Sequence, residues 1–302
     1  MDFIEVLKVI LLGIVEGITE WLPVSSTGHM LLVDKLFTLN ASTAFKDMFF
    51  VVIQLGAILA VVVMFWKKLF PWRVQKSTVA TGEKTSDGME IRATKRSIIA
   101  DKNIFKLWLK VIVACVPAAV IGLVLEALDL EKHLEHPLII ALALIIYGVA
   151  FIVIEHFNKK RDLPIKTTDD ISYKKALIIG AFQVLSLIPG TSRSGATIIG
   201  ALLIGIDRPA GSEFTFFLAI PVMLGASALK ILKFIVKGGV LAGAEIGYLI
   251  IGMIVAFAVS MLAIKFLMNF VKKHSFASFG WYRIALGGVV IVTLVILPLI
   301  FG

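Results

Sequence analysis

Pro23 ends an apolar stretch of the chain and is followed by a run of residues that could do chemistry: Ser25, Ser26, Thr27, Gly28 and His29. A serine or threonine hydroxyl becomes a nucleophile when a base takes its proton, and histidine is the usual base near neutral pH. Glycine allows the backbone to approach a ligand closely. The run therefore predicts a nucleophilic site. The alternative is an ordinary helix start, with a serine as the N-cap and His29 as a hydrogen-bonded polar side chain.

Two acidic residues precede this run on the same apolar stretch. Glu16 and Glu20 are four residues apart, so they lie on one face of a helix, one turn from each other. Two carboxylates at that spacing repel each other, which favours the uptake of a proton or a cation. Because ionisable residues inside a membrane are costly and usually functional, we expect both to belong to the site. The alternative is that they face water or pair with a distant arginine.

A second polar run, Pro189 to Gly195, interrupts another apolar stretch. Here hydroxyl side chains and glycines surround Arg193: Thr191, Ser192, Ser194, Gly190 and Gly195. A guanidinium beside hydroxyls and free backbone N–H groups at a helix start is typical of a phosphate site. Together, the two runs predict phosphoryl chemistry on an anionic substrate. Taken by itself, Arg193 could also be an arginine that snorkels to the membrane interface.

Long apolar helices must position these runs. The chain has 302 residues, of which 59% are hydrophobic and 17% charged, with a mean hydropathy of +0.96. That composition excludes a cytosolic enzyme, a disordered protein and a nucleic-acid-binding domain. Backbone groups in hydrocarbon must be bonded internally, so apolar stretches of about 20 residues are predicted to be spanning helices. Six are predicted, at 45–66, 110–125 (with 105–109 leading in), 137–157, 214–236, 246–270 and 281–301.

The two polar runs break apolar stretches 3–22 and 176–206. Irregular backbone at membrane depth must be buried in protein or line a cavity, so each stretch is predicted to be a re-entrant helix–loop–helix hairpin. The stretches resemble each other, and each is followed by a span with a Leu-Gly-Ala sequence. The expected fold class is an all-α polytopic membrane protein with two inverted-topology repeats, each a hairpin plus three transmembrane helices. We expect a single membrane domain, 1–302, with repeats at 1–157 and 172–302.

The distribution of charge agrees with this topology. The formal net charge is +9, and 19 Lys and Arg residues fall in the loops predicted to be cytoplasmic, at 67–104, 156–175, 206–213 and 271–283. Only four fall in the loops predicted to be external, at 34–46, 126–137 and 237–245. The asymmetry follows the positive-inside rule, so we expect no nucleic-acid partner. The insertion at 67–104 is polar and has no strong period, which predicts a mobile cytoplasmic loop.

Both polar runs resemble the signature motifs of one family. The sequences EGITEWLPVSSTGH (16–29) and PGTSRSGAT (189–197) are similar to those of the undecaprenyl-diphosphate phosphatases, the bacitracin-resistance membrane enzymes of bacteria. The family patterns are (E/Q)xxxE, PVSSTGH and PGxSRSxxT, and the chain contains each without a departure. The resemblance covers the whole chain, including the order and spacing of the spans. The insertion at 73–103 is longer than is common in the family.

The resemblance implies an activity, a location and partners. The enzyme would remove the terminal phosphate of undecaprenyl diphosphate and return the monophosphate carrier to cell-wall synthesis. Its site would open toward the outer face of the bacterial plasma membrane, where used carrier appears. A polyprenyl diphosphate lipid and membrane lipid are the expected partners. A homodimer is an arrangement that the sequence leaves open.

The resemblance also implies roles for individual residues. Ser26 would be the nucleophile, with His29 as its base or as the proton donor to the leaving group. Glu16 and Glu20 would hold a divalent cation, Mg or Ca, or orient His29. The diphosphate would be bound by Arg193, Ser192, Thr191 and Ser194, and the loop would be supported by Thr27 and Ser25.

Two other functions fit parts of the pattern. Inverted repeats with broken helices are typical of transporters, so the alternative is a transporter or flippase of a phosphorylated lipid. A pure carrier needs no hydroxyl–imidazole pair, which favours hydrolysis. A phosphatidic-acid-type phosphatase requires an SRxxxxxH motif, and the sixth residue after Arg193 is Ile199, which excludes that class.

Overall fold

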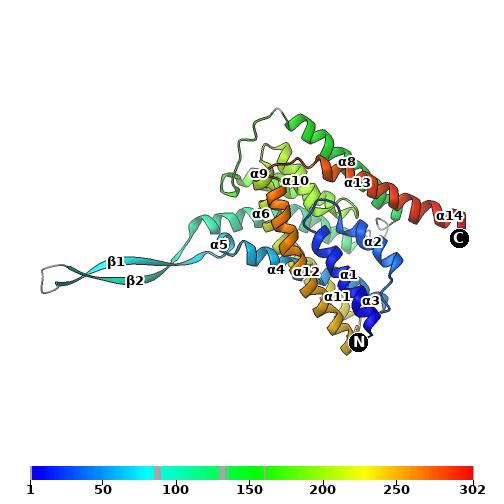
Figure 1. The fold of residues 1–302 in the computed structure, drawn as a ribbon, viewed down its shortest axis with the longest axis horizontal. Coiled ribbons are helices and arrows are strands. Elements are labelled where there is room, and N and C mark those ends of the chain that lie inside the picture. The colour runs from blue at the N-terminus through cyan, green and yellow to red at the C-terminus, as the bar shows by residue number, and fades with distance from the viewer. Residues whose placement is uncertain (1, 85–89, 129–133, 135, 160, 302) are drawn as a thin grey trace.

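The computed structural model describes residues 2–84, 90–128, 134, 136–159 and 161–301. Within these residues, helices make up nearly all of the regular structure (Figure 1). Six described helical segments are long and apolar enough to cross a membrane, and they follow one another in the predicted order. The described chain is therefore an all-α polytopic membrane protein to which one pair of strands is added.

Each predicted span coincides with a helical segment. The first consists of two helices, α3 (Thr43–Val52) and α4 (Gln54–Met64), which meet at Ile53. The next four are α6 (Lys102–Ala127), α8 (Pro137–Asn158), α11 (Arg208–Val236) and α12 (Gly243–Phe270). The last is α13 (Ala277–Ile291), which continues through a π-helical turn, Val292–Ile296, into α14 (Leu297–Phe301). Side chains of Asp101, His136 and Asp207 cap the first turns of α6, α8 and α11.

The two stretches that carry the polar runs are each broken into a pair of short helices. The first pair is α1 (Phe3–Thr19) and α2 (Ser26–Leu36), and the second is α9 (Tyr173–Val184) and α10 (Arg193–Leu203). The longest of the four, α1, has 17 residues and is thus about 26 Å long, short of a hydrocarbon core of about 30 Å. As predicted, a polar loop separates the two helices of each pair. A 3-10 turn, Leu185–Leu187, follows α9.

Each of these pairs packs against helices from the other half of the chain. α1 lies along α12, and α9 lies along α6. Glycines permit both approaches, because a Cβ at Gly13 would lie 3.0 Å from the carbonyl oxygen of Gly252 and one at Gly180 only 2.1 Å from that of Ala114. Because each pair packs on the other half of the chain, the two polar loops come together.

The helices α8 and α13 also lie side by side (Figure 1). A Cβ at Gly148 would lie 2.7 Å from the carbonyl oxygen of Gly280, and a Cβ at Gly280 would lie 2.6 Å from that of Gly148. Further along, Gly287 faces Ala141 and Ile145, so the two helices run in opposite directions. Small residues allow close contact between helices in a membrane, where packing rather than hydrophobic burial holds helices together.

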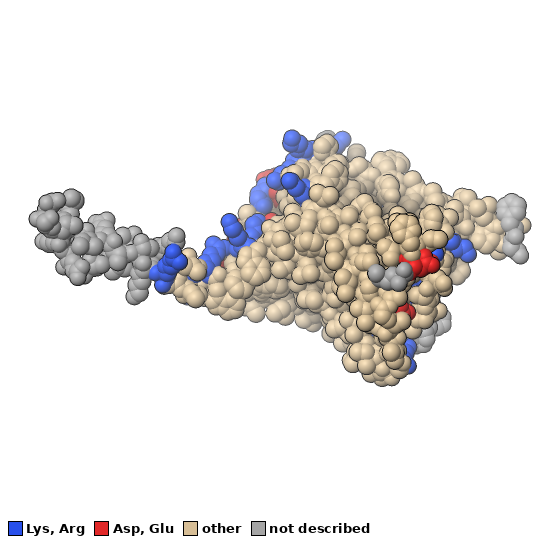
Figure 2. All heavy atoms as spheres, turned by 60° about the horizontal axis from the view of Figure 1, so that its bottom comes forward, with Lys and Arg blue, Asp and Glu red and all other residues tan. Residues whose placement is uncertain are grey.

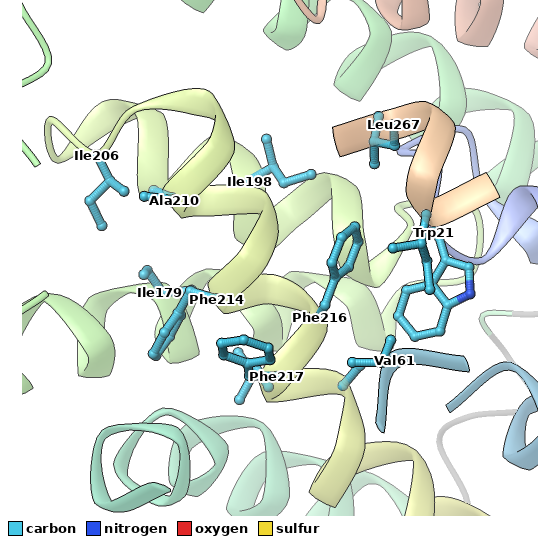
Figure 3. Close-up of a cluster of buried hydrophobic side chains, with 14 of the residues drawn as sticks. Trp21, Val61, Ile179, Ile198, Ile206, Ala210, Phe214, Phe216, Phe217 and Leu267 are labelled. Atoms are coloured by element: carbon cyan, nitrogen blue, oxygen red, sulfur yellow. The ribbon is translucent and has the colours of Figure 1, made fainter. Parts of the chain in front are cut away.

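The first polar loop is also anchored to α11 by aromatic side chains. Trp21, directly after α1, is fully buried and packs edge-on against Phe216, with ring centroids 5.3 Å apart (Figure 3). Phe214 and Phe217 on the same helix are likewise fully buried. The dense packing around Trp21 therefore fixes the start of the loop that carries the serines.

The insertion at 73–103 differs from the prediction of a mobile loop. Its described residues form two antiparallel strands, β1 (Trp72–Lys84) and β2 (Glu90–Ala100), paired from Trp72 with Ala100 to Lys84 with Glu90. Figure 1 shows them as a ribbon that projects from the helical body. Apolar and polar residues do not alternate regularly along the described strands, so the sequence pattern does not mark them. Residues 85–89 of the insertion lie outside the described residues.

Lys and Arg side chains gather at the end of the molecule from which the ribbon projects, as Figure 2 shows. Two short elements lie at this end of the chain's long helices, α5 (Trp66–Leu69) before the ribbon and a 3-10 turn, Thr168–Asp170. Lys110, on α6, donates to the carbonyl oxygen of Asp169 at 2.7 Å and joins that turn to the helical body. Lys68, before the ribbon, and Thr168, in the 3-10 turn, both bond to Glu213 on α11, so these segments lie together.

The contact between α9 and α6 gives a test of the fold. Gly180→Ala is expected to lower the free energy of unfolding by about 1–3 kcal/mol, because the new methyl group would overlap the carbonyl of Ala114. Thermal unfolding in detergent measures the change. The control is Gly225→Ala on α11, where a Cβ meets no atom within 4 Å and better helix propensity should leave stability equal or higher. Equal unfolding of both variants would contradict the helix pairing.

Candidate active site

Ser25 and Ser192 hold corresponding places at the ends of the two polar loops. Each is the N-cap of the following helix and has a positive φ, 74° and 69°, which residues other than glycine rarely adopt. Their side chains accept hydrogen bonds from the backbone N–H groups of Gly28 and Gly195, at 3.3 and 3.2 Å. The cap bonds offset the strained backbone and fix the residue at which each helix begins.

Glu20 joins the two loops. It lies at the C-terminal end of α1, and its carboxylate accepts one hydrogen bond from Ser26 Oγ at 2.8 Å and another from Arg193 Nη2 at 3.1 Å. Ser26 and Arg193 are the first residues of α2 and α10. The side chains of Glu20 and Arg193 are only 8% and 10% exposed, so the ion pair is formed away from water. An acid, a hydroxyl and a guanidinium from both runs therefore meet at one point.

Arg193 has a buried Nε donor that no acceptor among the described residues satisfies. Its Nη1 donates to the carbonyl oxygen of Thr215 at 3.1 Å, and its Nη2 donates to Glu20, but its buried Nε has no partner among the described residues. The guanidinium carbon lies 5.8 Å from the centre of the Trp21 ring. A buried N–H group without a partner is unfavourable, so this edge of the guanidinium is suited to an anionic group.

The hydroxyl residues around Arg193 tie the second loop to the first. Ser194 Oγ donates to the carbonyl oxygen of Glu20 at 3.2 Å, and Ser192 Oγ lies 3.1 Å from Ser194 Oγ. Thr191 is completely buried. Thr197, one turn later, donates to the carbonyl oxygen of Arg193 at 2.9 Å. These bonds hold the guanidinium-bearing loop against the end of α1.

His29 is bound to a residue that the sequence analysis did not identify. Its Nδ1 lies 2.7 Å from the carbonyl oxygen of Ser25, and its Nε2 lies 2.7 Å from the hydroxyl of Tyr282. Because a carbonyl only accepts, Nδ1 carries the proton, and in the neutral ring Nε2 accepts from Tyr282. The two rings are stacked, with an interplanar angle of 7°. Both ring nitrogens of His29 are therefore bonded to groups other than Ser26, whose hydrogen-bond partner is Glu20. The role of His29 stays a prediction.

Glu16 lies one turn before Glu20 and beside Gln54. It is 1% exposed, and its Oε1 has no hydrogen-bond partner among the described residues. Nowhere in the described part of the chain do three or more His, Cys, Asp or Glu side chains form a group that could hold a metal. Magnesium, however, is usually bound by one or two carboxylates together with water and substrate phosphates. The two glutamates, with one free oxygen and a neighbouring amide, fit a hard divalent cation on that pattern.

Two further residues at this place were missed. Arg283 falls in the loop 271–283 that was predicted to be cytoplasmic. In the structure it lies on α13 and is completely buried. Tyr282 precedes it and contacts His29. The available signal was a charged residue next to a long apolar run, which in a membrane points to function. Thr27 follows Ser26 in the first turn of α2 but is exposed, and its predicted supporting role stays a prediction.

Comparison with known proteins places the chain in a family. The profile of the family described as bacitracin resistance protein BacA matches residues 9–289. The chain belongs to the BacA family. The matched region contains both polar loops, Glu16 and Glu20, and the ribbon, so the site lies within what the chain shares with the BacA family.

Several proteins similar to this chain match it over nearly its full length. A protein of Enterococcus faecalis named undecaprenyl-diphosphatase is 62% identical over 287 residues, which is 95% of this chain and 96% of that protein. Proteins of the same name from Lachnoclostridium phytofermentans and Lactococcus lactis subsp. lactis are 52% and 53% identical, over 96% and 97% of this chain and 97% of each protein.

The ion pair at the centre of the site can be tested by a double-mutant cycle. Removing Glu20 leaves a buried guanidinium unpaired, and removing Arg193 leaves a buried carboxylate unpaired, so each alanine variant should be destabilised. The double variant loses both charges and should be more stable than the sum of the single changes predicts, by about 1–3 kcal/mol. Unfolding in detergent measures the coupling. Additive changes would show that the two side chains do not interact.

Proposed function

We propose that this chain hydrolyses the terminal phosphate of undecaprenyl diphosphate and releases undecaprenyl phosphate and inorganic phosphate. The reaction returns the lipid carrier to cell-wall synthesis and confers resistance to bacitracin. Membership of the BacA family and the names of the relatives support this activity. The single observation that carries it is the carboxylate of Glu20, which binds the Ser26 hydroxyl with one oxygen and the Arg193 guanidinium with the other.

Ser26 is the proposed nucleophile and Glu20 its base. As Ser26 Oγ bonds to the terminal phosphorus, the bond from that phosphorus to the bridging oxygen breaks, and undecaprenyl phosphate leaves. The hydroxyl proton passes to Glu20, which already accepts a hydrogen bond from it at 2.8 Å. Water then cleaves the phosphoserine and restores the hydroxyl. His29, when protonated at Nε2 as well as at Nδ1, is the proposed proton donor to the leaving group, and direct attack by water that neutral His29 activates is the alternative route.

Arg193 is the proposed diphosphate ligand. Phosphoryl transfer is accelerated mainly by positioning and by neutralising charge, which a guanidinium with a free Nε and a helix N-terminus provide. Ser192, Thr191 and Ser194 surround it and would supply further hydrogen bonds. Ser25 supports the opposite loop as the cap of α2, and Thr27 follows it on the exposed side.

Glu16 and Glu20 are the proposed ligands of a divalent cation, Mg or Ca. When bound, the cation would neutralise charge on the phosphate oxygens. The free oxygen of Glu16 supports this role, because a buried carboxylate oxygen without a donor is unfavourable. Glu16 also lies near enough to Glu20 and Arg193 for their charges to interact.

The architecture behind this site is proposed to be a pair of inverted repeats in the bacterial plasma membrane, with the site open to the outer face. Three observations support the pseudo-symmetry. The packing of α1 on α12 corresponds to that of α9 on α6, and the caps Ser25 and Ser192 both have a positive φ. The helices α8 and α13 pack against each other in antiparallel directions. The Lys and Arg side chains at the end with the ribbon support the orientation. Association into a homodimer stays a prediction.

A transporter or flippase of a phosphorylated lipid remains the second candidate, and the same inverted arrangement is what favours it. A carrier has to bind and release its lipid unchanged. It gains nothing from a hydroxyl whose hydrogen-bond acceptor is a buried carboxylate, as found for Ser26. The hydrogen bond between Ser26 and Glu20 therefore favours hydrolysis.

Release of phosphate from a polyprenyl diphosphate by purified protein tests the proposed activity. Arg193→Ala should lower release by about 100-fold or more, because the charge that stabilises the transferred phosphoryl group is lost. The exposed Arg161→Ala is the matched control and should keep the wild-type rate. Near-normal turnover by Arg193→Ala would contradict the phosphate site. Lipid movement across sealed vesicles without phosphate release by the wild-type protein would instead identify a transporter.

Removal of metal tests the proposed cation. A chelator should abolish phosphate release, and added Mg or Ca should restore it, because the cation that Glu16 and Glu20 would hold neutralises charge on the phosphate oxygens. Glu16→Gln should raise the cation concentration at half-maximal rate by about tenfold or more. Asp162→Asn, at an 87% exposed side chain, should leave that concentration unchanged. Full activity in the presence of chelator would show that the reaction needs no cation.

A further inference from the structure

Arg283 lies on α13 between the two polar loops and is completely buried. Its guanidinium donates to four backbone carbonyl oxygens. Nη1 bonds to Pro23 at 3.2 Å, and Nη2 bonds to both Gly190 and Thr191 at 2.9 Å. Nε lies 3.5 Å from the carbonyl oxygen of Leu144 on α8. Four of the five N–H groups of this side chain therefore have acceptors.

The bonding of Arg283 differs from that of other arginines in the helical body. Arg193 pairs with Glu20, and Arg208 forms a two-pronged ion pair with Glu155. Arg283 has no carboxylate partner among the described residues, and the ring of Tyr147 lies 5.8 Å from its guanidinium carbon. A buried cation is costly without a counter-charge, so its retention points to a task that a neutral side chain would not perform.

The acceptors of Arg283 occupy matching places in the two loops. Pro23 lies two residues before the cap Ser25, and Gly190 lies two residues before the cap Ser192. Gly190 has a φ of +93°, and a Cβ there would lie 2.5 Å from the carbonyl oxygen of Ile140, so only glycine fits. One rigid, planar group thus fixes the distance between the two loops just before the residues that carry the chemistry.

We propose that Arg283 is a positioning residue, which holds the loop of Ser26 and the loop of Arg193 in register. The proposal rests on the proposed phosphatase function and adds to it. Because its donors are already bound to carbonyls and none of its surface is exposed, Arg283 does not serve as a phosphate ligand. It acts through the two loops, and its removal leaves each loop intact but poorly placed against the other.

If Arg283 has this role, its substitution should change kcat much more than KM. Binding of the diphosphate needs only the loop of Arg193, whereas attack by Ser26 needs both loops in register. Arg283→Gln should therefore lower kcat by about 100-fold, the effect of an ångström-scale misplacement. KM should change by less than about threefold, because ground-state binding is kept. Arg283→Lys keeps the charge but has no planar fork, so it should restore part of kcat.

The experiment compares these variants with Arg208→Lys, which weakens the two-pronged pair with Glu155 away from the polar loops. Each variant is purified, its folded fraction is measured by thermal unfolding, and phosphate release is expressed per folded protein. Hydrogen exchange then follows the backbone amides of both loops. In the Arg283 variants, we expect the amides of both loops to exchange faster than in the wild-type protein. In Arg208→Lys, the exchange rates of both loops should equal those of the wild-type protein. Exchange in the helices far from the site should be unchanged in every variant.

The outcomes are distinguishable. Wild-type kcat in Arg283→Gln, or unchanged exchange in the loops, overturns the proposal, and a rise of KM with kcat kept would assign Arg283 to phosphate binding instead. If Arg283→Gln does not fold, Arg283→Lys decides, because wild-type kcat in that variant contradicts the need for a planar fork. Absence of phosphate release in the wild-type protein would overturn the proposed function, whereas the exchange measurement would still test the connection between the loops.

Discussion

The ion pair between Glu20 and Arg193 is the interaction on which the polar centre of this protein depends. Both side chains are withdrawn from water, where neither charge is tolerated without the other. They come from loops that are 173 residues apart in the sequence. Their attraction therefore requires two distant segments to lie side by side, and the surrounding contacts serve that requirement. Trp21 fixes one loop against α11, and Ser194 binds the other loop to the backbone of Glu20.

The packing of the helices explains how both loops reach the same place. Each short helix that leads into a loop lies on a long helix of the other half, and glycines allow the backbones to touch. Neither half contains a complete set of chemical groups, because the hydroxyl and acids lie in the first and the guanidinium in the second. A change that separates α1 from α12, or α9 from α6, would therefore disturb the chemistry as well as the packing.

The sequence predicts the spans and both polar loops, because a membrane makes apolar length and broken helices easy to recognise. It does not decide the partner of Ser26, since Glu20 and His29 are both near it in sequence. The cap at Ser25 and the hydroxyl of Tyr282, far along the chain, determine that choice. The role of Arg283 was not predicted because a charged residue at the start of an apolar run is typical of the membrane–water interface. The ribbon was missed because apolar and polar residues do not alternate regularly along its strands.

The two oxygens of Glu20 have a thermodynamic consequence. One oxygen is held by the group that would grip an anion, and the other by the group that would attack it. An anion that binds the Arg193 guanidinium competes with the Glu20 carboxylate and weakens the ion pair. By reciprocity, a carboxylate that binds another group leaves the guanidinium free for the anion. In the proposed mechanism, an anion that binds Arg193 would free Glu20 to take the proton of Ser26, so the two steps are coupled. Without an anion, the carboxylate stays paired with the guanidinium.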